Sequence, residues 1–102
     1  MASHLMSRRS NKREREHMGR VAKMACICCT LLGRSQLSKT DVHHVRVGHG
    51  AAQRAGDFCT IPLCHDDCHQ GKNGVHGDQH YLHILKMTQM DLLNATLERL
   101  YG

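Results

Sequence analysis

The stretch Cys64-His-Asp-Asp-Cys68-His69 carries two cysteines four positions apart, and Cys26-Ile-Cys28-Cys29 carries a similar pair nearer the N-terminus. Residues 30–63 lie between the two pairs. Paired thiolates at the two ends of a long loop are how tetrahedral structural zinc sites are assembled, and binding of the ion is then coupled to folding. The sequence therefore predicts a structural Zn²⁺ held by Cys26, Cys29, Cys64 and Cys68, with Cys28, His65 or His69 as alternatives for one member.

The composition agrees with a domain that depends on a metal. The chain of 102 residues contains six Cys and ten His, but only two Tyr, one Phe and no Trp. A domain this small buries a modest fraction of its surface, so metals or disulfides often supplement its core. Disulfides are the alternative, but three cysteines within residues 26–29, the abundant His and the lack of a signal-peptide pattern argue against them. No run of 18 apolar residues occurs, so we expect no membrane span and a cytoplasmic location.

The net charge of +5 lies in the first 23 residues, where seven basic residues outnumber two acidic ones. The remainder of the chain is neutral. Positive charge ahead of a neutral domain indicates a polyanion partner, usually nucleic acid, whereas the alternative is a solvated leader. We therefore expect residues 1–19 to form a flexible basic arm that contacts DNA and residues 20–102 to form the domain, with residues 1–6 resembling a cloning scar. The candidate phosphate contacts of the arm are Arg8, Arg9, Lys12 and Arg13.

The remaining pattern predicts a small α+β fold. Residues 12–24 can form a helix, residues 41–47 alternate as in a strand, residues 58–63 form a second extended run, and residues 64–69 open a helix. Two C-terminal helices are expected, the first capped by Asp78 and the second started by a capping box of Thr88 and Asp91. The apolar face of the second helix consists of Leu92, Leu93, Leu97 and Leu100. This face would either pack in the core or form a dimer interface.

The histidines exceed what one zinc site needs. His43 and His44 are adjacent on the strand-like segment, and His69 directly follows a cysteine. Because neighbouring residues of a strand point to opposite faces, one of the pair can bind a metal while the other acts as a general base. A divalent metal stabilises the charge that develops on a scissile phosphate. These residues together predict a phosphodiester hydrolase.

The order of these motifs resembles the HNH endonuclease family in its zinc-stapled, ββα-metal form, a treble-clef-like core. The residues that carry it are the Cys-x-x-Cys pair, Asp41-Val-His-His-Val-Arg46, and Ile61-Pro-Leu-Cys64 with Cys68-His69. The resemblance implies that His43 and His69 bind a catalytic divalent metal, Mg²⁺ foremost with Mn²⁺ or Ni²⁺ as alternatives, and that His44 is the general base. The chain departs from the family by its longer second cysteine spacing and by a missing middle Asn, for which Asp57 is the nearest polar candidate.

Further phrases are similar to phage and prophage nucleases of the Ref (recombination enhancement function) type, which depend on RecA. They are Val42-His-His-Val-Arg-Val-Gly48, Ala51-Ala-Gln-Arg-Ala-Gly-Asp57 and Gly74-Val-His-Gly77, and the resemblance covers roughly residues 20–80. It implies His76 as a further metal ligand, DNA and a RecA-type recombinase filament as partners, and a bacterial or phage-encoded protein. Arg46 is a candidate contact to the scissile strand. The alternative function is a non-catalytic zinc module, which needs only the cysteines and the basic arm. The sequence does not decide between a monomer and a dimer.

Overall fold

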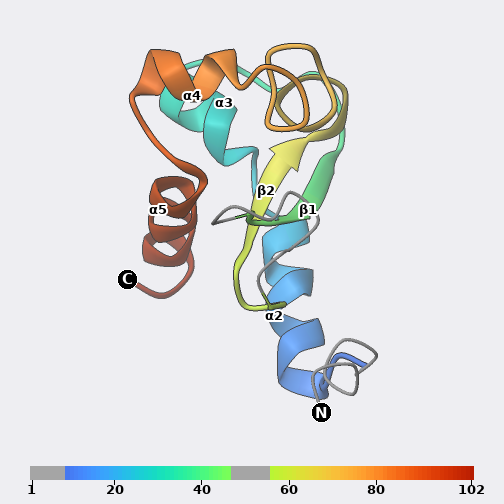
Figure 1. The fold of residues 1–102 in the computed structure, drawn as a ribbon. Coiled ribbons are helices and arrows are strands. Elements are labelled where there is room, and N and C mark those ends of the chain that lie inside the picture. Colours follow the sequence, from blue (N-terminus) through green and yellow to red (C-terminus); the bar gives the residue numbers. More distant parts are fainter. Residues whose placement is uncertain (1–8, 47–55) are drawn as a thin grey trace.

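A computed structural model describes residues 9–46 and 56–102 (Figure 1). Arg8 and the possible scar at residues 1–6 lie outside the described residues. The chain forms a small α+β fold in which helices surround a two-stranded sheet. The elements in chain order are α2 (Lys12–Ala22), α3 (Ile27–Leu32), β1 (Thr40–His44), β2 (Thr60–Cys64), the π-helix η1 (His65–His69), α4 (His80–Leu85) and α5 (Gln89–Tyr101).

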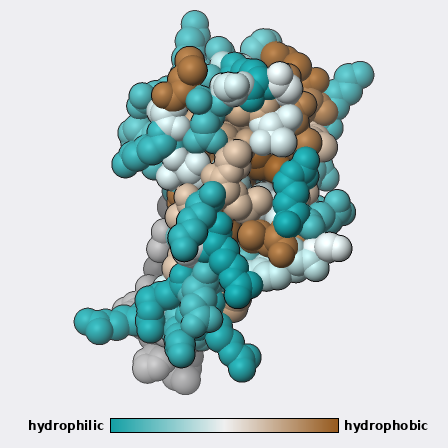
Figure 2. Space-filling view, turned by 180° about the vertical axis from the view of Figure 1, so that it is seen from behind, coloured by the Kyte–Doolittle hydropathy of each residue, from teal (hydrophilic) through white to brown (hydrophobic). Residues whose placement is uncertain are grey.

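Helix α2 is a folded part of the domain. A capping box of Asn11 and Glu14 starts it, and it contacts both strands of the sheet. Its buried face includes His17 and Val21, the latter fully buried. The predicted helix in this region is therefore confirmed, but assigning residues 12–19 to a flexible arm was wrong. The basic residues of this segment lie on the outside of a helix whose inner face packs on the sheet, and Figure 2 shows the hydrophilic surface along this part of the molecule.

The two strands pair antiparallel, with Thr40 opposite Cys64 and His44 opposite Thr60. All five residues of β2 are buried, whereas most of β1 is only partly buried. Beyond β1, the Val45 N–H still donates to the Cys59 carbonyl at 3.0 Å. Both predicted extended segments are thus confirmed with shifted ends. The pairing places Cys64, the first residue of the second cysteine pair, opposite Thr40.

Helix α3 was not predicted from the sequence. It begins at the first cysteine pair and ends at Gly33, whose φ of 76° lies in the left-handed region that glycine adopts without strain. The helix is only six residues long. Cysteine has modest helix propensity, so the local sequence gives little signal for it.

The C-terminal helices close the core. The capping box of Thr88 and Asp91 is confirmed at the start of α5. Leu92 and Leu93 of its apolar face are buried against the core, which favours the core over a dimer seam. Gln79 occupies the N-cap position of α4 in a left-handed conformation with φ 59°, but the Asp78 carboxylate still accepts from the His80 N–H at 3.0 Å. Within the described ranges, no helix has the length and apolar character to cross a membrane.

Candidate metal centres and active site

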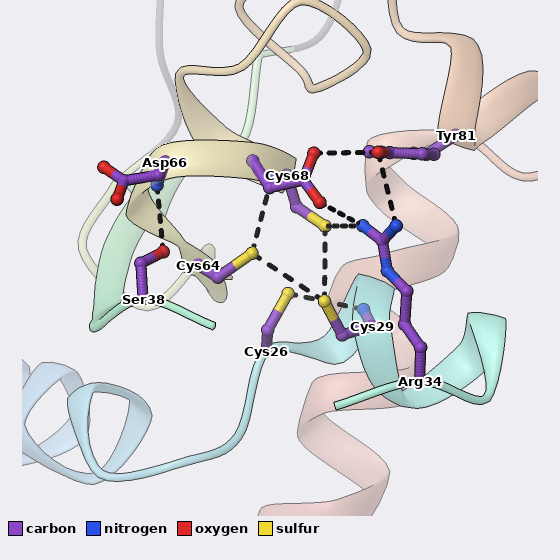
Figure 3. A network of polar contacts seen from close by, with 9 residues as sticks. Cys26, Cys29, Arg34, Ser38, Cys64, Asp66, Cys68 and Tyr81 are labelled. Carbon is purple, nitrogen blue, oxygen red and sulfur yellow. Dashed lines mark hydrogen bonds and ion pairs between the residues drawn. The ribbon is translucent and has the colours of Figure 1, made fainter. Parts of the chain in front are cut away.

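Four buried cysteines converge from the two ends of the long loop, as predicted (Figure 3). The Cys29 Sγ lies 3.7 Å from the Cys64 Sγ and 3.6 Å from the Cys68 Sγ. Sulfurs bound to one tetrahedral Zn²⁺ at about 2.3 Å are separated by about 3.8 Å, so the spacing fits zinc. A disulfide needs an S–S distance of about 2.05 Å, and none of the six cysteines is paired at such a distance. The fourth member of the set is Cys26.

Local hydrogen bonds hold each cysteine pair in place. The Cys29 N–H donates to the Cys26 Sγ, and the Cys68 N–H donates to the Cys64 Sγ, both at 3.3 Å. The second bond spans one residue more than the first, and the wider turn of the π-helix η1 accommodates that extra residue. The longer spacing noted in the sequence therefore still allows the sulfurs to meet. Of the alternative ligands, none joins the four cysteine sulfurs: Cys28, His65 and His69 lie outside this group.

The cysteine cluster has a positively charged neighbour that the sequence did not reveal. The Arg34 guanidinium lies 3.5 Å from the Cys68 Sγ, pairs with Asp67 and stacks 4.4 Å from the centre of the Tyr81 ring. Burial raises the pKa of Cys29 to about 11, so without a metal this thiol keeps its proton at neutral pH. Binding of Zn²⁺ therefore releases protons, and the guanidinium offsets the negative charge of the resulting thiolates.

Three histidines form a second group, separate from the cysteines. His43 comes from β1, His69 from η1 and His76 from the loop that follows η1. One nitrogen of each ring lies within 4.8 Å of the others, and the His43 Nδ1 is 3.2 Å from the His69 Nε2. His43 is 4% exposed, and burial lowers its pKa to about 4. Burial also lowers the pKa of His76. The first ring is therefore neutral at physiological pH, as a metal ligand must be.

Hydrogen bonds at the outer edges of two rings fix which nitrogens carry hydrogen. The Gln89 Oε1 accepts from the Arg46 backbone N–H at 2.9 Å, so this end of the amide is an oxygen, and the His43 Nε2–H donates to it at 2.9 Å. The Asp41 carboxylate accepts from the His69 Nδ1–H at 2.8 Å. The two remaining nitrogens, His43 Nδ1 and His69 Nε2, face each other at 3.2 Å. Nitrogens bound to one ion at about 2.1 Å lie about 3.0 to 3.4 Å apart, which fits this pair.

Close contact between two backbone segments positions the ring of His76. A Cβ on Gly74 would lie 2.4 Å from the carbonyl oxygens of Asp67 and Cys68, so only glycine allows the loop to touch η1. The loop is then hydrogen-bonded to η1, with the His76 N–H donating to the His69 carbonyl at 3.1 Å. The position of His76 thus depends on the same π-helix that carries the second cysteine pair.

His44 follows His43 on β1, and successive side chains of a strand alternate between its two faces. The His44 Nε2 is 2.7 Å from the Asp57 Oδ1, and the Ser10 hydroxyl donates to the other oxygen of that carboxylate. Because a carboxylate only accepts, the His44 Nε2 carries the hydrogen and Nδ1 carries the lone pair. Asp57 therefore lies where it orients the proposed base, although the family pattern has an Asn.

The predicted site residues thus divide into groups. The structure brings together the four cysteines, the three histidines His43, His69 and His76, and the pair of His44 with Asp57. Arg46 is exposed next to the histidine group, and Arg9, Lys12 and Arg13 are exposed at the start of α2. Sequence reasoning missed Asp41 and Gln89 as partners of the ligand histidines. Asp41 stands two positions before His43, which was a usable signal, whereas nothing near Gln89 in the sequence points to this role.

Comparison of the chain with protein-family models, curated proteins and solved structures finds no match in any of the three.

Proposed function

We propose that this protein is a metal-dependent endonuclease of the HNH type that hydrolyses DNA phosphodiester bonds. One observation carries the proposal: three imidazoles converge on one point, and the next residue of β1 after His43 is His44, which is held by Asp57. Two ring nitrogens lie 3.2 Å apart in this group, a separation that suits two ligands of one ion. The order β1, β2, η1 in the chain also agrees with a ββα arrangement.

In this proposal, His44 and Asp57 carry out the proton transfer from the attacking water. A divalent cation held by His43, His69 and His76 would stabilise the charge developing on the scissile phosphate and its leaving oxygen. His44 accepts a proton from the attacking water at Nδ1, because Asp57 holds the hydrogen on Nε2. The carboxylate then stabilises the imidazolium that results, as the acid partner does in other base–acid pairs.

The donor set favours a transition metal over Mg²⁺. Neutral imidazole nitrogens suit Zn²⁺, Ni²⁺ and similar ions, whereas Mg²⁺ prefers oxygen ligands and gives up its water reluctantly. Of the ions expected from the sequence, Ni²⁺ therefore fits this group better than Mg²⁺ or Mn²⁺.

Basic residues provide the contacts to DNA in this proposal. Arg46 is exposed. Burial is the main cause of the lowered pKa of His43, and the charges of the neighbouring histidines and of Arg46 lower that pKa further. Three basic residues are exposed around the start of α2, namely Arg9, Lys12 and Arg13. Ser10, which lies among them in the chain, donates a hydrogen bond to Asp57. Contacts of this kind position a phosphate backbone without reading sequence, so binding should weaken steeply with salt. A recombination-associated role alongside a RecA-type filament stays a proposal that depends on the family resemblance.

A substitution of the proposed base tests the function. His44→Ala should abolish cleavage of plasmid DNA with Mn²⁺ or Ni²⁺, while zinc content and circular dichroism stay unchanged. His83→Ala is the matched control, because His83 is exposed on α4 and outside the clusters, and it should cleave normally.

The opposite outcome would favour the alternative, a non-catalytic zinc module that binds nucleic acid. If the wild-type protein leaves plasmid and single-stranded DNA intact with Mg²⁺, Mn²⁺ and Ni²⁺, and also with a RecA-type filament present, the nuclease proposal fails. The cysteine cluster and the basic face of α2 would then be the functional parts of the molecule.

A further inference from the structure

Two of the three aromatic residues of this chain lie half-exposed around one buried histidine. Phe58 is 49% exposed and Tyr101 is 55% exposed, whereas His17 between them is 4% exposed. The His17 ring centre lies 5.4 Å from that of Phe58 and 5.8 Å from that of Tyr101. The three residues come from the segment before β2, from α2 and from the end of α5. Aromatic side chains are scarce here, so leaving two of them on the surface at one place is notable.

The rings are held in fixed positions rather than loosely exposed. The His17 Nδ1 and the Tyr101 hydroxyl are 2.8 Å apart, and the two rings are nearly parallel, with 21° between their planes. Rings that are already oriented lose little conformational freedom when a flat ligand stacks on them. This favours a role in recognition over a chance exposure of apolar surface.

Positive charge lies on the same side of α2. The Arg20 guanidinium is 5.7 Å from the centre of the Tyr101 ring. Arg13 lies seven residues before Arg20, which is about two turns of α2. Both arginines therefore lie along the same side of the buried His17. On the other side of His17, α2 carries Glu14 and Val21, and both are buried. The aromatic surface is therefore bordered by cations on its exposed side.

We propose that Phe58, Tyr101 and Arg20 form a platform for single-stranded nucleic acid. Bases stack on the two rings, and Arg20 and Arg13 contact the phosphates, the combination of stacking and charge that single strands require. A duplex is a poorer ligand because its bases are already stacked inside the helix. A peptide partner would not use the cations in this way.

This inference deepens the proposed function, on which its connection to catalysis depends. Phe58 directly follows Asp57, which holds His44 at 2.7 Å. A strand that stacks on Phe58 therefore runs close to the proposed general base, and the platform would select the single-stranded substrate for cleavage.

Binding without cleavage tests the platform. The His44→Ala protein is titrated into a fluorescently labelled oligothymidylate of 15 nucleotides, and anisotropy is recorded at several salt concentrations. Phe58→Leu and Tyr101→Leu should each weaken binding about ten-fold, the equivalent of about 1.4 kcal/mol. Tyr101→Phe keeps the ring but removes its hydrogen bond to His17, so it should bind more weakly than the parent and more tightly than Tyr101→Leu. Ile84→Ala is the control, because Ile84 is 55% exposed on α4 away from the platform, and it should have no effect.

The salt dependence separates stacking from charge. Arg20→Gln should lower the slope of log affinity against log salt by about 0.7, whereas Phe58→Leu should leave the slope unchanged. Unchanged binding in both leucine variants, or equal affinity for duplex and single strand, would overturn the proposal. So would sedimentation showing that these variants instead disrupt a dimer. Platform binding without any cleavage by the wild-type protein would reject the nuclease but keep the platform.

Discussion

Gln89 supports the histidine group without belonging to it, and replacing it tests the geometry directly. Its side-chain oxygen is the acceptor for two N–H donors at 2.9 Å, one on the His43 ring and one on the Arg46 backbone. Gln89→Leu keeps the volume but removes the acceptor. A buried donor left without a partner costs about 1–3 kcal/mol, and loss of an outer hydrogen bond typically weakens a metal site 10- to 100-fold.

The assay is calorimetric titration of Ni²⁺ into protein whose cysteines already hold Zn²⁺. We expect Gln89→Leu to raise the Kd for Ni²⁺ about 10- to 100-fold and to lower the free energy of unfolding in urea by about 1–3 kcal/mol. Gln89→Glu is the matched control, because a carboxylate oxygen still accepts both hydrogen bonds, and it should bind Ni²⁺ nearly as well as the parent. Wild-type affinity in Gln89→Leu would refute the reasoning that this amide fixes the tautomer of His43.

Three further predictions concern stability and metal content. Cys29→Ser should lose zinc and unfold, as followed by metal analysis and circular dichroism, and a folded, zinc-loaded variant would reject the cysteine site. Gly74→Ala should weaken Ni²⁺ binding, because its Cβ meets two carbonyl oxygens at 2.4 Å, whereas Gly19→Ala, with open space around it in α2, should stabilise the fold by about 0.5–1 kcal/mol. The folded pKa of His43 is about 4, below the 6.5 of the unfolded chain, so the unfolded state takes up the proton first. Without metal at the histidines, the free energy of unfolding should therefore fall between pH 6.5 and pH 4, by up to about 1.4 kcal/mol per pH unit, and His43→Gln should flatten this slope. A stability that rises toward pH 4 would contradict the burial of a neutral ring.

Features that depend on short-range sequence were predictable. The paired cysteines, the alternation of β1 and the capping box of Thr88 with Asp91 are each set by residues within a few positions of one another. The different environments of His43 and His44 also follow from the alternation of a strand. Their roles as ligand and base stay predictions, since geometry alone does not test a reaction.

Features that depend on tertiary contacts were not predictable. Gln89 meets His43 from 46 residues away, and no local pattern signals that contact. The helix at residues 12–22 was underestimated because its basic residues resemble a solvated tail, while the buried residues Glu14, His17 and Val21 are only three positions among eleven. Asp78 has a capping side chain, but the left-handed backbone at Gln79 moves the start of α4 by one residue.

The central claim is that this chain holds two different metal ions, one on cysteines and one on histidines. Native mass spectrometry of the zinc-loaded protein after addition of Ni²⁺ measures this directly. We predict one Zn²⁺ and one Ni²⁺ per wild-type chain, and one Zn²⁺ alone in His76→Ala with its fold intact. A wild-type chain that takes up only zinc, or a His76→Ala chain that still binds Ni²⁺ as tightly as the parent, would contradict the account.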